Sequence, residues 1–371
     1  MFTSGRCPPT TISRVPSRIK LLVIFGGQSA EHDVSRVTAS HVLQAVDPER
    51  YEVTPVAIGR DGRWMLAEAA QAALRVGPHC LPDALKVAGP TVEPMSLLAE
   101  RGPLVALPLL HGPFGEDGTV QGLLELAAVP YVGAGVLASA LGMDKAKAKE
   151  VFAFHGIAQA RWLSWRADEV PADLADRIAS ELGYPCFVKP ANLGSSVGVS
   201  KVHDPSELMA AVDLALSYDE WLVVEEAVVG REIELAVLGN LDPKVSVPGE
   251  VIPGAEFYDY EDKYHDGKAQ LVIPAELDEA VVAQFQRLAI AAYRACRLEG
   301  MARVDFFYEE QGPARGPLLN EVNSIPGFTP ISMYPKLWQA SGIGYSELID
   351  TLIGLALERS ERRALRSRTD R

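Results

Sequence analysis

Several features that would assign the sequence to a familiar class are scarce in it. No apolar run approaches the roughly 20 residues that a membrane-spanning helix needs. The first 18 residues contain arginines but no apolar segment, which argues against a secretory signal and predicts a disordered leader. The four cysteines lie far apart and form no Cys-x-x-Cys pair, so neither a zinc knuckle nor a disulfide framework is indicated. We therefore expect a cytoplasmic protein with no membrane partner.

Basic residues are also fewer than acidic ones. The 35 Lys and Arg against 49 Asp and Glu give a formal net charge of −14, which repels polyphosphate backbones and argues against general nucleic-acid binding. The sequence lacks GxxxxGK[ST], lacks GxGxxG after its first strand and lacks HRD with DFG. P-loop enzymes, typical dinucleotide binders and protein kinases are therefore disfavoured. An anionic substrate would have to be held by local positive groups.

Apolar residues are plentiful, and their pattern predicts a mixed α/β protein. They make up 48% of the 371 residues, enough for two or three globular domains. An apolar run over 19–25 stops at a Gly-Gly turn and is followed by an amphipathic segment, which predicts a βα unit. With further strand-like runs at 51–58 and 104–110, this predicts an open α/β domain. The segment 59–102 shows too little periodicity for an assignment.

The remainder of the chain predicts two further layers of strands and helices. Helices are expected over 143–154, 172–182, 205–216 and 277–296, and strands over 186–189, 221–228 and 233–239. A strand pair is expected on either side of a Gly-rich turn at 311–316. The arginine-rich tail that begins at residue 359 is expected to fray.

The predicted strand pair carries the most informative polar residues. Side chains alternate between the faces of a strand, so Arg303 and Asp305 share one face, as do Glu321 and Asn323. If the strands form a hairpin, an arginine, two carboxylates and an amide converge. Hard oxygen ligands suit Mg²⁺, which shares its coordination with nucleotide phosphates, whereas the alternative is a surface strand pair with a salt bridge. Gly327 follows closely and could bring a backbone N–H to a ligand, which favours the first interpretation.

Two lysines are candidates for holding phosphates. Lys189 ends an apolar strand just before a small-residue loop, whose amides at Gly194, Ser195 and Ser196 could surround phosphate oxygens. Lys145 is a weaker candidate, because the lysines at 145, 147 and 149 could equally form a solvated helix face.

Other polar residues are ambiguous alone. Glu31 follows the first strand and its Gly-Gly turn, where α/β sheets often bind ligands, yet it could simply compensate a helix N-terminus. Ser332, Tyr264 and His111 carry no individual signal.

Taken together, in order and spacing, these residues resemble the D-alanine-D-alanine ligases of the ATP-grasp superfamily. The resemblance spans about 19–357. The matching stretches are 25–27 with 31–35, 110–118, 142–145, 188–190 with 194–198, 257–260 with 263–264, 302–305, and 320–329.

The resemblance implies a three-domain α/β ligase that clamps ATP between two antiparallel sheets. The implied ranges are a leader at 1–18, an N-terminal α/β domain at 19–138, a central ATP-grasp domain at 139–225, a C-terminal catalytic domain at 226–358 and a basic tail at 359–371. A homodimer is a further expectation from the family.

The resemblance also implies roles for residues. ATP would be held by Lys145, Lys189, Gly194, Ser195, Ser196, Glu225, Glu226, Val228, Glu232 and Lys263. Two Mg²⁺ ions, with Mn²⁺ as a possible substitute, would be bound by Asp305, Glu321 and Asn323. The two D-alanines would lie near Glu31, His111, Arg303, Ser332 and Met333. The catalytic group would comprise Glu31, Ser195, Tyr264, Arg303, Gly327 and Ser332.

The implied reaction has two steps. The first D-alanine carboxylate attacks the γ-phosphate to give an acyl phosphate, and the amine of the second D-alanine then attacks its carbonyl. Arg303 and the Gly327 amide would stabilise the oxyanion, and the loop 257–267 would close as a lid.

Three alternatives stay open at the level of sequence. A ligase that uses D-lactate as its second substrate is disfavoured because Tyr264 keeps the pattern of the dipeptide-forming enzymes. A nucleotide-binding sensor without catalysis would not need the oxyanion donor Arg303. A nicotinamide dehydrogenase would need the missing Gly-rich fingerprint.

Overall fold

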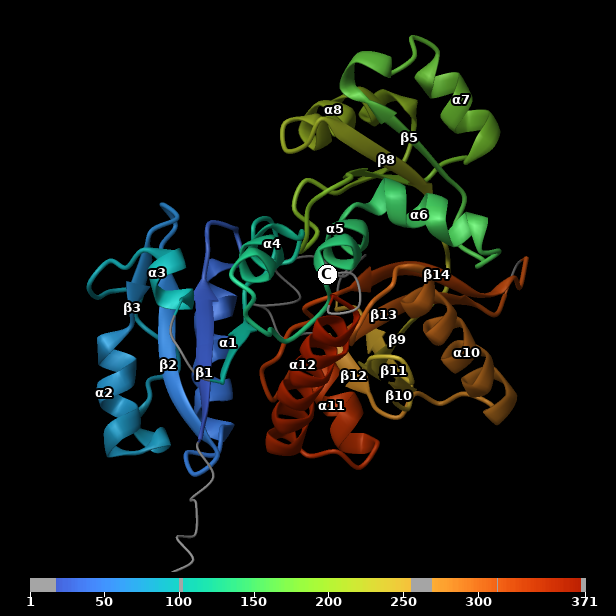
Figure 1. Ribbon diagram of the computed structural model, residues 1–371. Coiled ribbons are helices and arrows are strands. Elements are labelled where there is room, and N and C mark those ends of the chain that lie inside the picture. Colours follow the sequence, from blue (N-terminus) through green and yellow to red (C-terminus); the bar gives the residue numbers. More distant parts are fainter. Residues whose placement is uncertain (1–17, 100–102, 255–268, 312, 368–371) are drawn as a thin grey trace, which may run out of the picture.

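The computed structural model describes residues 18–99, 103–254, 269–311 and 313–367. In these ranges the chain forms three sheets, which lie in three successive parts of the sequence (Figure 1). No helix in the described ranges is both long enough and apolar enough to cross a bilayer. The exact domain boundaries stay a prediction.

The first sheet is built around the apolar run that opens the ordered chain. Its strand order is β3-β2-β1-β4, with β1 parallel to β2 and β4, and β3 antiparallel to β2. The strands are β1 (Ile19–Gly26), β2 (Tyr51–Ile58), β3 (Trp64–Leu66) and β4 (Leu104–Pro108). Alternate residues of β1 enter different cores, Leu21 and Val23 on one face, Leu22 and Ile24 on the other, because helices cover both faces.

The segment 59–102, which could not be assigned from the sequence, supplies some of the helices that cover the first sheet. It forms β3, α2, η1 and α3. The helical elements of this region are α1 (His32–Ala45), α2 (Glu68–Val76), η1 (Pro78–Cys80), α3 (Pro94–Leu98) and α4 (Thr119–Leu126). Helices α1 and α2 contribute to one core, and α3 and α4 to the other.

The second sheet is antiparallel and forms the upper lobe of Figure 1. Its order is β5-β8-β6-β7, from β5 (Trp162–Arg166), β6 (Cys186–Pro190), β7 (Ser200–Val202) and β8 (Trp221–Glu226). Its core also takes side chains of α7 (Leu174–Glu181) and α8 (Pro205–Leu216), and η2 (Ala167–Glu169) follows β5. All buried members of this core lie between residues 165 and 224, so the lobe has a core of its own.

The third sheet is also antiparallel, with the order β12-β11-β9-β13-β14 and β10 paired to β9. Its strands are β9 (Arg231–Gly239), β10 (Lys244–Val245), β11 (Gly249–Ile252), β12 (Gln270–Val272), β13 (Gly300–Glu309) and β14 (Gly316–Asn323). The helices that pack with it are α5 (Val136–Met143), α6 (Lys145–Phe154), α10 (Glu279–Ala295), α11 (Met333–Ala340) and α12 (Tyr345–Ser367).

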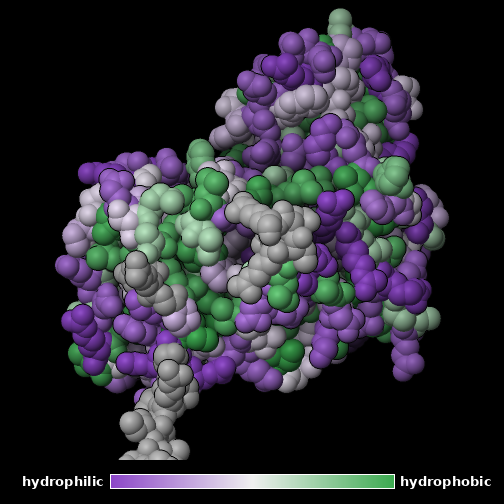
Figure 2. All heavy atoms as spheres, in the orientation of Figure 1, coloured by the Kyte–Doolittle hydropathy of each residue, from purple (hydrophilic) through white to green (hydrophobic). Residues whose placement is uncertain are grey.

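The first and third sheets share one hydrophobic core. Leu21 and Val23 of β1 belong to the same buried cluster as Leu348 and Leu352 of α12. Burial of such a side chain stabilises the fold by about 1.5–3 kcal/mol. The upper lobe is tied to the third sheet partly by charge, because Arg315, just before β14, donates to Glu226 of β8 at 2.5 Å. Figure 2 shows hydrophobic side chains along the line where this lobe meets the lower body.

One expected helix boundary and the expected frayed tail differ from the structure. The helix predicted over 143–154 begins at Lys145, because Asp144 has an extended backbone and its side chain accepts the N–H of Lys147 at 2.9 Å. The prediction that the tail frays from residue 359 was wrong, since α12 continues to Ser367 and Arg359 is only 3% exposed.

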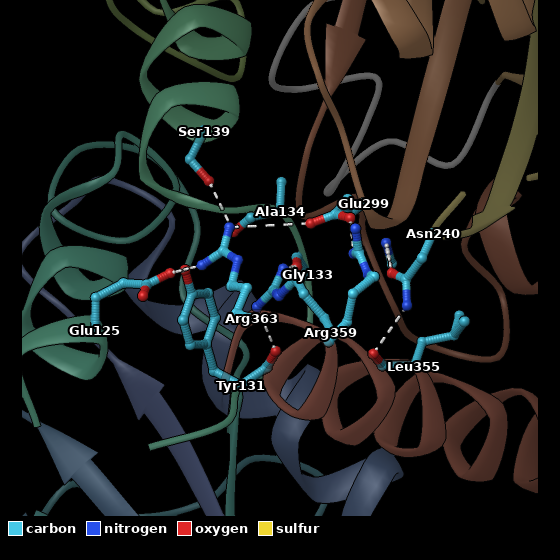
Figure 3. Close-up of polar contacts among 12 residues, drawn as sticks. Glu125, Tyr131, Gly133, Ala134, Ser139, Asn240, Glu299, Leu355, Arg359 and Arg363 are labelled. Carbon is cyan, nitrogen blue, oxygen red and sulfur yellow. Dashed lines mark hydrogen bonds and ion pairs between the residues drawn. The ribbon is translucent and has the colours of Figure 1, made fainter. Parts of the chain in front are cut away.

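Arg359 anchors the end of α12 to the segment that leaves the first sheet (Figure 3). Its guanidinium donates to the backbone carbonyls of Tyr131, at 2.8 Å, and Gly133, and lies 4.3 Å from the centre of the Tyr131 ring. Gly133 in turn lies against Gly300 at the start of β13, where an added Cβ would be 3.2 Å from the Gly133 nitrogen. Arg363 forms an outer ion pair with Glu125. The buried arginine therefore joins α12 to residues 131–133, and the Gly133–Gly300 contact joins this segment to β13.

We predict that Arg359→Met lowers the free energy of unfolding by about 2–4 kcal/mol, because two buried carbonyls lose their donors. Arg359→Lys keeps the charge but not the planar fork and should recover only part of this loss. Arg363→Ala is the matched control, since its half-exposed pair should be worth less than about 1 kcal/mol. Urea unfolding measures all three variants. Equal midpoints for Arg359→Met and Arg363→Ala would contradict the anchoring role.

Candidate active site

One large cleft, with a volume of about 1240 Å³, is lined by residues of all three sheets and their connections. Every site residue predicted from the sequence within the described ranges lines it. These residues are Glu31, His111, Lys145, Lys189, Gly194, Ser195, Ser196, Glu225, Glu226, Val228, Glu232, Arg303, Asp305, Glu321, Asn323, Gly327, Ser332 and Met333. Lys263, Tyr264 and the predicted lid at 257–267 lie outside the described residues.

The predicted hairpin is confirmed on the side of the third sheet. Arg303 of β13 lies opposite Asn323 of β14, and Asp305 lies opposite Glu321. Arg303 donates to both carboxylate oxygens of Asp305 at 2.8 Å, and the Asn323 amide donates to one of them at 2.8 Å. The four residues therefore form one polar surface on an otherwise apolar sheet.

Glu234 is a member of this surface that the sequence reasoning missed. Its Oε2 lies 2.9 Å from Arg303 Nε. Burial alone would lower the pKa of Arg303, but Asp305 and Glu234 hold that pKa well above its ordinary value. The alternation Glu232-Ile233-Glu234 on β9 was the available signal, because it places both glutamates on one face of the strand.

The donor atoms on this surface fit Mg²⁺ by their chemistry. Asp305, Glu321 and Asn323 offer carboxylate and amide oxygens without a thiolate or an imidazole. Among the described residues, no group of three or more His, Cys, Asp and Glu side chains could hold a metal ion. Two carboxylates and one amide suit an ion that completes its coordination with water and substrate oxygens.

The opposite side of the cleft carries lysines. Lys189 of β6 lies 3.1 Å from Glu225 of β8, and Lys145 at the start of α6 donates to the backbone oxygen of Leu193 at 2.5 Å. The loop between β6 and β7 is tightly turned, with positive φ angles of 52° at Ser195 and 58° at Ser196. Both lysines and this loop thus border the same space.

Lys149 is a second residue that the sequence reasoning missed. Its side chain is 2% exposed and its Nζ lies 3.3 Å from Glu225. The spacing from Lys145 to Lys149 is i to i+4, which places these two lysines on one helix face. Lys147 instead pairs with Glu150 in solvent. Burial raises the pKa of Glu225, but Lys149 and Lys189 outweigh it and hold that pKa at about 2.

The first sheet contributes three residues to the cleft. The Ser195 hydroxyl donates to the Glu31 carboxylate, which joins the first sheet to the serine loop. His111 Nδ1 lies 3.2 Å from the backbone oxygen of Ile325. Glu116, which the sequence reasoning gave no role, accepts the N–H of Gly112 at 2.8 Å. Burial and the nearby Glu31 raise the pKa of Glu116 to about 8.

The remaining predicted residues also line the cleft. The Ser332 hydroxyl lies 2.8 Å from the Thr329 hydroxyl, and Met333 begins α11 directly after it. A Cβ added at Gly327 would be 3.2 Å from Ser332 Oγ, so the chain passes close to that hydroxyl. Glu226 is engaged by Arg161 at 2.7 Å and by Arg315.

Known proteins match most of the chain that forms the cleft. The family model described as D-ala D-ala ligase N-terminus covers residues 20–134, and the one described as D-ala D-ala ligase C-terminus covers 151–354. A D-alanine--D-alanine ligase of Geobacillus kaustophilus is 46% identical over 365 residues, covering 93% of this chain and 96% of the relative. One of Halothermothrix orenii is 47% identical, covering 92% and 99%.

Solved structures give the same result. The D-alanine-D-alanine ligase from Coxiella burnetii superposes with a TM-score of 0.79 at 36% identity, covering 95% of this chain and 97% of the other. VanG D-Ala:D-Ser ligase from Enterococcus faecalis gives 0.78 at 34% identity, covering 91% and 99%. The fold is therefore that of an ATP-grasp enzyme, as expected. The chain belongs to the D-alanine-D-alanine ligase family.

We predict that the buried cluster of Glu225, Lys149 and Lys189 makes the free energy of unfolding decrease at acid pH. A carboxylate with a pKa lowered from 4.5 to about 2 stabilises the fold above pH 4.5, and this contribution is lost as the pH falls towards 2. Glu225→Gln leaves Lys149 without its counter-charge and should cost about 3–5 kcal/mol at pH 7. In the variant, the loss between pH 4.5 and 2 should be smaller. Urea unfolding across this pH range is the measurement.

The matched control for Glu225→Gln is the double variant with Lys149→Met, which removes the stranded buried ammonium and should regain much of the lost stability. A Glu225→Gln protein as stable as the wild type at pH 7 would contradict the role of the cluster.

Proposed function

We propose that the protein joins two molecules of D-alanine to D-alanyl-D-alanine at the expense of ATP, through a D-alanyl phosphate. The observation that carries this proposal is one cleft in which lysines face a carboxylate surface, in a chain of this family. The curated relatives are named for this reaction, and the match covers almost their whole length. The product would be a precursor of peptidoglycan.

In the first step the chain binds ATP and the first D-alanine. Lys145, Lys189 and the amides of the loop 194–196 bind the phosphates, and the β8 to β9 segment with Glu226, Val228 and Glu232 holds the nucleoside. Glu31 binds the ammonium group of the first D-alanine. The hydrogen bond from Ser195 holds the Glu31 carboxylate beside the loop 194–196. The substrate carboxylate is thereby presented to the γ-phosphate.

Asp305, Glu321 and Asn323 would hold Mg²⁺, for which Mn²⁺ could substitute. When bound, the metal supplies neutralisation of the charge that develops on the transferred phosphoryl group. Arg303 orients the Asp305 carboxylate through its two hydrogen bonds, so the ligand is held in position without rearrangement.

In the second step the amine of the second D-alanine attacks the acyl phosphate. Arg303 and the backbone N–H of Gly327 stabilise the oxyanion, and the Ser332 hydroxyl binds the carboxylate of the second D-alanine. Three further points stay predictions. They are closure of the 257–267 lid with Lys263 and Tyr264, assembly as a homodimer, and a cytoplasmic location.

We predict that purified protein releases phosphate from ATP only when D-alanine and Mg²⁺ are both present, and that mass spectrometry identifies D-alanyl-D-alanine. L-alanine is the control substrate. Assays that add D-lactate or D-serine to D-alanine test the second position, because one solved relative is a D-Ala:D-Ser ligase. Equal release with L-alanine or without an amino acid would refute the function.

We also predict that Glu321→Gln lowers kcat by about 10²-fold or more, because one metal ligand loses its charge. The concentration of Mg²⁺ that gives half-maximal activity should rise in the same variant, whereas its unfolding midpoint without metal should stay near that of the wild type. Glu310→Gln, an exposed change at the far end of the hairpin, is the matched control. An unchanged Mg²⁺ requirement in Glu321→Gln would argue against the assigned metal site.

A further inference from the structure

One ring nitrogen of His111, Nε2, is buried without a hydrogen-bond partner among the described residues. The residue follows β4, is 5% exposed, and its Nδ1 lies 3.2 Å from the Ile325 backbone oxygen. A carbonyl oxygen only accepts hydrogen bonds, so Nδ1 carries the hydrogen in the neutral ring and Nε2 carries a lone pair. The contact with Ile325 therefore fixes the tautomer.

The lone pair on Nε2 is buried and unsatisfied within the described part of the chain. Nε2 has no hydrogen-bond partner there, and the residue lines the large cleft. A buried acceptor without a donor costs about 1–3 kcal/mol, which is a reason to look for a ligand that supplies one. Burial lowers the pKa of His111, while the Glu31 carboxylate acts in the opposite direction. Burial thus favours the neutral form of the His111 ring.

The second step of the proposed reaction needs a base. An amino acid in neutral water carries an ammonium group, which has no lone pair and cannot attack a carbonyl carbon. A proton must therefore leave the second D-alanine before the C–N bond forms.

Other charged groups in the cleft are poorly suited to this task. The charged groups that line the cleft with His111 include Glu31, Glu116, Lys145, Arg303, Asp305 and Glu321, and Glu31 acts on the His111 ring through its charge. Glu31 already accepts the Ser195 hydroxyl, and Asp305 is held by Arg303 and Asn323. Glu116 retains its proton at neutral pH, because its pKa is raised to about 8. Lysine and arginine are already protonated, and Glu321 is a proposed metal ligand.

We propose that Nε2 of His111 accepts the proton from the ammonium group of the second D-alanine. This inference rests on the proposed function. The N–H bond breaks with its electron pair left on nitrogen, and an imidazolium forms beside Glu31. The amine lone pair then forms the C–N bond, the C–O bond to phosphate breaks with its electrons leaving on phosphate, and the second amine proton passes to the departing phosphate.

The test separates the base from the contact with Ile325. His111→Asn places an amide N–H where Nδ1–H stands, so it can keep the bond to Ile325 while Nε2 is lost. Dipeptide formation is measured beside hydroxamate formation, in which hydroxylamine replaces the second D-alanine. Hydroxylamine is neutral at pH 7, so it intercepts the acyl phosphate without a base. His155→Asn is the control, because its Nδ1 also meets a carbonyl, Val151, but on an exposed helix end.

We expect His111→Asn to form the hydroxamate within about threefold of the wild-type rate and to lose about 10²-fold or more in dipeptide formation at pH 7. The dipeptide defect should shrink as the pH rises and free amine becomes available. Dipeptide formation at the wild-type rate, or an equal loss in both reactions, would overturn the proposal. A wild-type protein that forms neither product would refute the ligase function itself.

A second measurement does not depend on the variant folding. In the wild type, the pH profile of kcat for the dipeptide should fall on the acid side of the His111 titration, and that of the hydroxamate should lack this fall. Identical acid limbs for the two products would overturn the role of His111.

Discussion

Strands β13 and β14 pair so that Arg303 lies opposite Asn323 and Asp305 opposite Glu321, and the candidate active site depends on this register. A slip of one residue would send every side chain of one strand to the other face of the sheet. Val304 and Val322 lie buried in the core beneath, which makes such a slip costly. The packing of apolar side chains on one face thus fixes the positions of the charged ones on the other.

The second constraint is that the first and third sheets share a core. Glu31 and His111 come from the first sheet and Arg303 from the third, so a substrate site made of all three needs these sheets in a fixed relation. The shared cluster with α12 and the buried Arg359 provide that relation. The upper lobe has its own core and is tied to this body partly by charge, through Arg315 and Glu226.

Much of the site could be predicted from the sequence because strand alternation and the spacing of residues within each motif are visible over short stretches of chain. Arg303, Asp305, Glu321 and Asn323 needed only two neighbouring strands to be located. Lys149 was missed because its partner Glu225 lies 76 residues away, and a lysine-rich helix looks solvated without that partner. The tail was misjudged for the same reason, since Arg359 finds its acceptors in Tyr131 and Gly133, more than 200 residues earlier. The segment 59–102 folds as short elements against the first sheet, and short elements leave little periodicity.

The two sides of the cleft differ in the sign of their charge, and this difference bears on how a protein of net charge −14 could hold a polyphosphate. On the upper side Lys145 and Lys189 line the cleft and Lys149 lies buried against Glu225, while the neighbouring Glu226 is held by Arg161 and Arg315. On the lower side Asp305, Glu321 and Glu234 stand against the single arginine Arg303. A triphosphate held by the upper lysines would be repelled by the lower carboxylates unless cations lay between them. The excess of carboxylates is therefore an argument from this chain's own charges for the divalent ions that we propose there.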